Sequence, residues 1–333
     1  MHNAITDVPG FRVGHAHDLQ AATGCTVILC PPGTLGGVDI RGSAAGTRQV
    51  DSLHSFHAVD EVHAVLLAGG SAFGLDASGG VMKYLEEKNI GYQTSAGKVP
   101  IVPTAIIYDL GLGNGQIRPD KEMGYQACLA SDSGKVAEGS VGVGAGASVG
   151  KLLGIRMATK GGVGTASLCL PDGVIVGALV VVNAFGDVLD PQSGKILAGA
   201  RDPENPQRFV NASKLIREGL KLPRRETAFQ NTSLGVVATN AKLTKRQAIK
   251  VAQMAQSGFV RTISPIHSTV DGDLIFALSC GEKLADVNTI GLMAEEVIAQ
   301  AVLRAIMQAD GLGLLPAYRD WPRKVDKESV SDY

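Results

Sequence analysis

The chain has 333 residues, an apolar fraction of 45% and a formal net charge of −1. Its length suggests about two domains or one large one, with enough residues for a substantial core. Near-zero charge without a basic run argues against nucleic acid as a partner, because phosphate binding needs clustered Lys and Arg. Five cysteines with no C-x-x-C pair favour buried thiols in a reducing compartment over a disulfide framework or a metal site.

Residues 1–18 are polar and lack the apolar centre of a signal peptide. No stretch approaches the roughly 20 apolar residues that a membrane-spanning helix needs. We therefore expect a cytoplasmic protein with no membrane partner.

The first third of the chain alternates apolar segments with glycine-rich connections. Short strands are predicted at 8–13, 25–30 and 63–70. Gly69 and Gly70 then turn into a helix over 72–88. Strand, glycine turn and helix suggest nucleotide binding, but the spacing is G-G-x-x-x-G rather than G-x-G-x-x-G, so we do not favour it.

The middle third predicts an apolar strand within 98–113 that ends at Tyr108, and a helix over 121–130. Glycine-rich strands follow at 139–149 and 162–170. The first of these runs into Gly150-Lys151 but lacks the spacing and the Ser/Thr of a phosphate-binding loop.

Residues 173–190 predict a hairpin that turns at 184–186. The segment 201–230 is rich in charge and proline, and we interpret it as a mobile, exposed linker with one helical turn.

The last third predicts strands at 232–240 and 274–280 and helices over 244–257 and 286–310, the first helix capped by Thr244. A charged tail follows from 316 to 333. Because strands dominate the first two-thirds and long helices come late, we expect a mixed α/β protein with stacked sheets and helices outside.

The stretch QNTSLGVVATNA, residues 230–241, contains the most informative candidate. A threonine freed at its N-terminus carries its own base, because an α-amino group with a pKa of about 7.7–8.0 is partly neutral at pH 7. To reach that state, the Thr232 hydroxyl would attack the Asn231 carbonyl, giving an ester that water opens. The alternative is an ordinary threonine at the start of a core strand.

The loop HSTVDGD, 267–273, places Asp271 and Asp273 two positions apart, on one face if the segment is extended. Two close carboxylates can divide the tasks of orienting a nucleophile and binding a proton or an ammonium group. A simple D-G turn is the competing interpretation, and His267 is a further candidate base. Asn183 and Tyr108, each closing an apolar strand, are candidates for oxyanion stabilisation.

Seven segments together resemble one family. They are VDIRGSAAGTR, LAGGSAFGLDASGGVMKYLEE, VPIVPTAIIYDL, GSVGVGAGASVGK, ALVVVNAFGDV and NTSLGVVATNAKLT followed by SPIHSTVDGDLIFALS. In this order, from residue 5 to about 310, they are similar to the self-processing L-aminopeptidase/D-esterase (DmpA-like) family. That family includes β-peptidyl aminopeptidases and nylon-oligomer hydrolases.

The resemblance implies an αββα sandwich that looks like the N-terminal-nucleophile hydrolase fold but differs in connectivity. It implies cleavage into an α chain, 1–231, with the mobile linker 201–231 at its end, and a β chain, 232–333, folded together as one domain. It carries the nucleophile to Thr232, the acidic pair to Asp271 and Asp273, and supporting roles to Asn183, Tyr108 and Lys151.

Within the family, Thr232 and the acidic pair resemble the nylon-hydrolase branch, since the β-peptidase branch carries Ser and Glu in the loop. The resemblance also implies a homotetramer, no metal or organic cofactor, and small peptide or amide substrates with a free amine. Two alternatives stay open: an acyltransferase of the ornithine acetyltransferase type, and a non-catalytic protein with the same fold.

Overall fold

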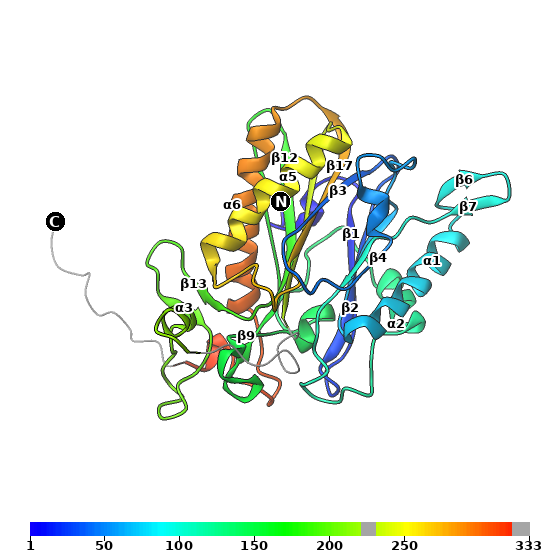
Figure 1. The fold of residues 1–333 in the computed structure, drawn as a ribbon. Coiled ribbons are helices and arrows are strands. Elements are labelled where there is room, and N and C mark those ends of the chain that lie inside the picture. The colour runs from blue at the N-terminus through cyan, green and yellow to red at the C-terminus, as the bar shows by residue number, and fades with distance from the viewer. Residues whose placement is uncertain (221–230, 322–333) are drawn as a thin grey trace.

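The computed structural model describes residues 1–220 and 231–321, in which two five-stranded sheets lie face to face (Figure 1). The first sheet has the order β1-β2-β5-β8-β4, with β1 Arg12–Asp18, β2 Thr23–Leu29, β5 Ala64–Ala68, β8 Thr104–Ile106 and β4 Thr47–Arg48. The second has the order β11-β12-β15-β17-β3, with β11 Gly162–Cys169, β12 Ile175–Asn183, β15 Thr232–Ala241, β17 Leu274–Lys283 and β3 Leu35–Ile40.

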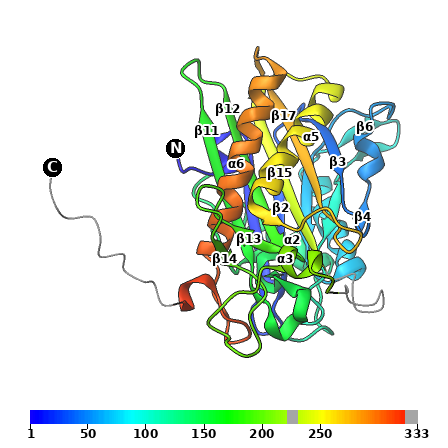
Figure 2. The same cartoon turned by 60° about the vertical axis from the view of Figure 1, so that its left-hand side comes forward.

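Helices cover both outer faces. On the first sheet lie α1 (Ala77–Glu87) and α2 (Lys121–Leu129), and on the second lie α5 (Lys245–Thr262) and α6 (Val287–Met307). Figures 1 and 2 show the resulting four layers, helix, sheet, sheet and helix. The predicted αββα sandwich is confirmed. Among residues 1–220 and 231–321, no helix is both long and apolar enough to cross a membrane.

The smaller elements lie around the sandwich. They are the short helix α3 Ala212–Arg217, the pairs β9 Ser148–Val149 with β10 Thr159–Lys160 and β6 Tyr92–Thr94 with β7 Gly97–Val99, and a three-stranded sheet of β14 Ile196–Ala198, β13 Asp187–Leu189 and β16 Ile263–Ser264.

The position of β12 between two cores explains why its sequence is apolar throughout. Leu179 and Val181 pack into the core between the two sheets, whereas Val180 and Val182 pack into the core under α5 and α6. Alternate side chains point to opposite faces of a strand, so a strand covered on both faces needs apolar residues at every position. Burying each such side chain contributes about 1.5–3 kcal/mol before entropy costs.

Close packing of α6 on β11 depends on glycine. A Cβ atom built on Gly164 would lie 2.1 Å from the main-chain oxygen of Ala301, which is too short for any real contact. The helix therefore approaches the strand more closely than alanine would permit.

Most predicted elements occur, with boundaries shifted by a few residues. The first strand starts at Arg12 rather than at residue 8, and residues 71–76 form a 3₁₀ turn before α1. Helix α5 begins at the predicted cap, where the Thr244 side chain accepts a hydrogen bond from the Gln247 N–H.

Two predictions for the glycine-rich middle are wrong. Residues 142–146 form a 3₁₀ turn, and only Ser148–Val149 is a strand there. The segment 173–190 is not a hairpin, because β12 pairs with β11 and β15 on its two edges and β13 pairs with β14 and β16. A strand with both edges occupied cannot also pair with its successor.

The predicted linker contains more structure than expected. Arg201 and Phe209 form an isolated bridge, and α3 follows. Residues 221–230, and the tail from 322 onward, lie outside the described residues.

Candidate active site

Thr232 and Asn183 stand opposite each other where β15 begins and β12 ends. They are antiparallel cross-strand partners, so their side chains lie side by side on one face. That face is the inner one, since Leu234 and Val181, two positions away on the respective strands, pack between the sheets. Both side chains are buried. The pair therefore lies between the two sheets, at one end of the sandwich.

Lys151 reaches the same place from a 3₁₀ turn, Lys151–Leu153. Its Nζ donates to the main-chain oxygen and to Oδ1 of Asn183, both at 2.8 Å. Burial lowers the pKa of Lys151 to about 7, although the negative charges of Asp271 and Asp273 act in the opposite direction. A large fraction of this amine is therefore neutral near pH 7.

Asp271 and Asp273 border the start of β15 from the loop before β17. Asp273 Oδ1 accepts the Ser233 N–H at 2.6 Å, and Asp271 Oδ1 accepts the Phe185 N–H at 3.3 Å. Burial, and next the charge of Asp273, raise the pKa of Asp271 to about 6. The structure thus brings the predicted acidic pair to the start of β15, the strand that carries the predicted nucleophile Thr232.

The peptide group between Asn231 and Thr232 is enclosed. Asn231 is 4% exposed and Thr232 is 3% exposed. The Thr232 hydroxyl donates to the Asn231 carbonyl oxygen at 2.5 Å. The hydroxyl and the carbonyl that the sequence predicts to react are therefore neighbours in a site shielded from bulk water.

Tyr108 approaches from the first sheet. Its main-chain oxygen accepts a hydrogen bond from Asn183 Nδ2 at 3.3 Å. Tyr108 also lines a narrow pocket together with Asp109, Ser148 and Lys151. All seven predicted site residues, Tyr108, Lys151, Asn183, Asn231, Thr232, Asp271 and Asp273, thus gather at this end of the sandwich.

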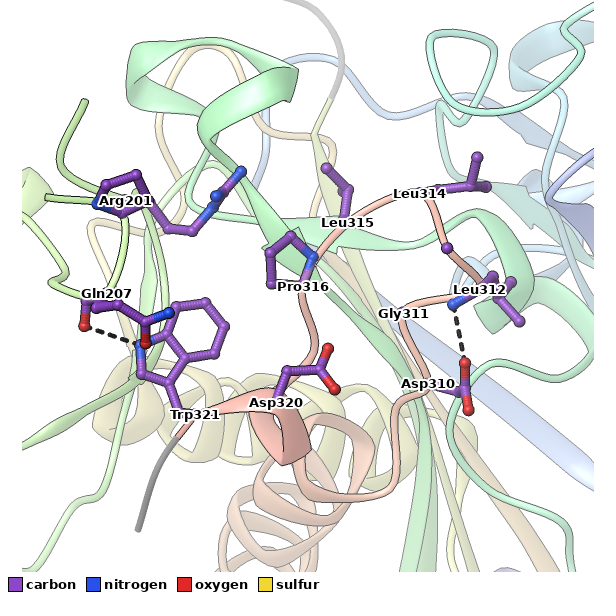
Figure 3. A pocket seen from close by; sticks show the side chains of 12 residues that line it. Arg201, Gln207, Asp310, Gly311, Leu312, Leu314, Leu315, Pro316, Asp320 and Trp321 are labelled. Atoms are coloured by element: carbon purple, nitrogen blue, oxygen red, sulfur yellow. Dashed lines mark hydrogen bonds between the residues drawn. The ribbon is translucent and has the colours of Figure 1, made fainter. Parts of the chain in front are cut away.

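A larger hollow of about 930 Å³, open to solvent, lies by the segment 310–321 (Figure 3). Its Arg201 side chain donates to the main-chain oxygens of Arg156 and Ala158. The indole N–H of Trp321 donates to the Gln207 oxygen at 3.0 Å. None of the predicted site residues lines this hollow, whereas Tyr108 and Lys151 line the smaller pocket. The candidate active site is therefore at the smaller pocket.

Ser268, a half-buried residue beside the site, was not among the residues predicted from the sequence. The Ser268 hydroxyl donates to Asp271 Oδ2, and His267 Nδ1 lies 3.2 Å from Asp273 Oδ2. Ser268 stands three positions before Asp271, a spacing that predicts a local side-chain hydrogen bond. His267, weighed as a base, contacts the carboxylate.

A second buried lysine, Lys160, was not predicted from the sequence because it belongs to none of the motifs considered. Its Nζ donates to the oxygens of Gly144 and Gly161, and burial lowers its pKa to about 7. Asp109, which partly offsets that shift, accepts hydrogen bonds from Thr23 and from the Gly70 N–H. The glycine turn that suggested nucleotide binding is therefore bonded to a carboxylate of the protein.

Within residues 1–220 and 231–321, no three His, Cys, Asp or Glu side chains cluster as metal ligands would. The predicted site residues bring together a hydroxyl, an amine of lowered pKa and two carboxylates. On an αββα sandwich, this arrangement defines a hydrolase of the N-terminal-nucleophile type.

Comparison with known proteins specifies the family. The model of peptidase family S58 matches residues 3–314, and the chain belongs to this family. An uncharacterized aminopeptidase of Mycobacterium leprae is 42% identical, with 95% of this chain and 93% of that protein covered. A 6-aminohexanoate-oligomer endohydrolase of Kocuria sp. is 32% identical, with 90% and 84% covered. The protein is thus an enzyme that hydrolyses amide bonds.

Solved structures support the fold. The L-aminopeptidase D-Ala-esterase/amidase of Ochrobactrum anthropi, described as a variant of the Ntn-hydrolase fold, matches with a TM-score of 0.69. Sequence identity is 20%, and 93% of this chain and 87% of that one are covered. A β-aminopeptidase of Burkholderia sp. matches with a TM-score of 0.68 at 22% identity, with 95% and 90% covered.

Proposed function

We propose that this chain cuts itself between Asn231 and Thr232 and then acts as an aminopeptidase-like amidohydrolase through the new N-terminal threonine. The observation that carries the proposal is the position of the buried Thr232 hydroxyl, 2.5 Å from the Asn231 carbonyl oxygen. Lys151 donates a hydrogen bond to Asn183, the cross-strand partner of Thr232. The products would be chains 1–231 and 232–333, which stay together because β12 and β15 pair along their length.

In the processed enzyme the Thr232 hydroxyl attacks the substrate amide carbonyl. Its proton passes to a neutral amine, that of Lys151 or the new α-amino group, and then to the leaving amine. Asn183 and Tyr108 orient the reacting groups, and Asp271 and Asp273 hold the start of β15. Water then hydrolyses the acyl-enzyme ester.

The names of two relatives support a class of substrate for this enzyme. One relative is named an aminopeptidase and another a 6-aminohexanoate-oligomer endohydrolase. We therefore propose small peptides, β-peptides or ω-amino-acid oligomers with a free amine as substrates.

Two further proposals concern location and assembly. The free state of all five cysteines supports a cytoplasmic location. The family resemblance supports a homotetramer of processed units.

The processing experiment is N-terminal sequencing of the purified protein on a denaturing gel. We expect two chains, the smaller beginning Thr-Ser-Leu-Gly. Hydrolysis of aminoacyl anilides should accompany the cut. Acetyl transfer to ornithine without anilide hydrolysis would instead support the acyltransferase alternative, and an uncut wild-type chain after incubation near neutral pH would contradict self-cleavage.

A pH profile tests the protonation states. Lys151 can accept a proton only when neutral, and its pKa of about 7 means that it is charged below that pH. Asp271, with a pKa of about 6, loses its charge on further acidification. The rate of anilide hydrolysis should therefore rise with pH between about 5 and 8 and then level off. A flat profile over this range, with the fold intact by circular dichroism, would contradict these roles.

A further inference from the structure

The carbonyl of the predicted cleavage site already accepts a main-chain donor. The Gly272 N–H donates to the Asn231 oxygen at 2.9 Å, and Asn231 and Asp271 form an isolated parallel bridge. The same oxygen accepts the Thr232 hydroxyl. If that hydroxyl attacks the adjoining carbon, negative charge develops on the oxygen to which Gly272 points.

The loop holds the residues on both sides of this peptide bond. Asn231 Nδ2 donates to the Val270 oxygen at 3.2 Å, and Asp273 Oδ1 accepts the Ser233 N–H at 2.6 Å. Gly272 stands between these two contacts, so its N–H is fixed relative to the carbonyl before any reaction.

The loop is itself anchored to the segment after β3. The Ala44 N–H donates to the Asp271 oxygen at 2.9 Å, and the Arg41 and Gly42 N–H groups donate to the Asp273 oxygen at 2.9 and 3.1 Å. A donor held in place by its surroundings needs no reorganisation when charge appears, which is the condition for effective oxyanion stabilisation.

Glycine is required at position 272 by space. A Cβ atom there would lie 2.8 Å from the Thr232 hydroxyl oxygen and 2.8 Å from the Ala44 oxygen. Both contacts are shorter than real Cβ contacts, so any side chain would displace the nucleophile or the anchor. The D-G-D spacing therefore has a cause beyond turn formation: the main chain passes directly beside the hydroxyl.

We propose, on the basis of the self-cleavage above, that the Gly272 main-chain N–H is the oxyanion donor of that reaction. Thr232 Oγ1 forms a bond to the Asn231 carbonyl carbon as its proton passes to a local base, and the carbonyl electron pair moves to the oxygen facing Gly272. Collapse breaks the C–N bond, and the nitrogen takes the proton to become the Thr232 α-amino group. Water then hydrolyses the ester to the Asn231 carboxylate and the Thr232 hydroxyl.

The direct test replaces the N–H by an ester oxygen. Cell-free translation with glycolic acid at position 272 removes the donor and adds no side chain. The matched control places glycolic acid at Gly33, which is exposed and has open space around it. Chain cleavage is followed over time on denaturing gels, and folding by circular dichroism and thermal melting.

We expect the folded 272 ester to cleave about 100- to 1000-fold more slowly than the Gly33 ester, the usual effect of losing one oxyanion donor. A folded 272 ester that cleaves as fast as the control would overturn the proposal while leaving self-cleavage intact. Absence of cleavage in the unmodified chain would overturn both. Gly272→Ala, made in cells, should likewise be cut more slowly than the parent, because its Cβ would displace the Thr232 hydroxyl or the Ala44 oxygen. Cleavage of this variant at the parental rate would contradict the close approach.

Discussion

Replacing Thr232 by alanine is expected to give a single uncut chain with amidase activity at the background level. The variant keeps the strand and its pairing with β12 but removes the hydroxyl that lies 2.5 Å from the Asn231 oxygen. Without it neither the ester that precedes cleavage nor the acyl-enzyme can form. Because Thr232 is buried but small, folding should be retained. A denaturing gel and an aminoacyl anilide assay measure the two losses.

Two variants serve as controls. Ser233→Ala removes the neighbouring hydroxyl, which lies on the opposite face of β15 and should leave cleavage unchanged. Thr232→Ser keeps a hydroxyl at the reacting position and should still be cut. Cleavage of Thr232→Ala at the same bond, or loss of cleavage in Ser233→Ala, would show that the nucleophile has been assigned to the wrong residue.

Replacing Lys151 by methionine is expected to slow chain cleavage about 10²- to 10⁴-fold, the range of a general acid–base group. Methionine has similar length and suits the buried position, but it cannot exchange a proton or donate to Asn183. The folded Lys151 has a pKa below its unfolded value, so its burial opposes folding below about pH 7, and that penalty fades as the pH rises toward 10.5.

The stability of Lys151→Met should therefore depend less on pH than that of the parent between about 7 and 10.5. Gel time courses measure cleavage, and urea unfolding at several pH values measures stability. Lys195→Met, at an exposed position, is the matched control and should behave as the parent does. A Lys151→Met chain that cleaves at the parental rate would remove this lysine from the mechanism.

Local patterns in the sequence were enough to predict several elements. The helix over 121–130, the Thr244 cap and the strand that starts at Thr232 all occur, because their signals lie within a few residues along the chain. The site residues were found in the same way and through the family resemblance. These residues lie together at one end of the sandwich, as a shared site requires, and their individual roles stay predictions.

The predictions of secondary structure were wrong where a segment's structure depends on contacts with residues far away in the sequence. Residues 187–189 have the local pattern of a returning hairpin strand, but β15 and β11 occupy both edges of β12, so the segment joins β14 and β16 instead. Likewise, glycine-rich residues 142–146 form a turn rather than a strand, and all three of their glycines lie where a Cβ would meet main-chain or buried atoms of other segments.

The sequence by itself therefore determined the layered α/β class and selected the dipeptide Asn231–Thr232 and the acidic pair Asp271 and Asp273 as candidates, since these predictions depend on residue type and short spacing. Only the tertiary structure decided that Lys151 bonds to Asn183 and that the Gly272 N–H meets the Asn231 carbonyl. Such contacts join residues 32 to 41 positions apart, and their geometry depends on strand register and packing between layers, which no local pattern encodes.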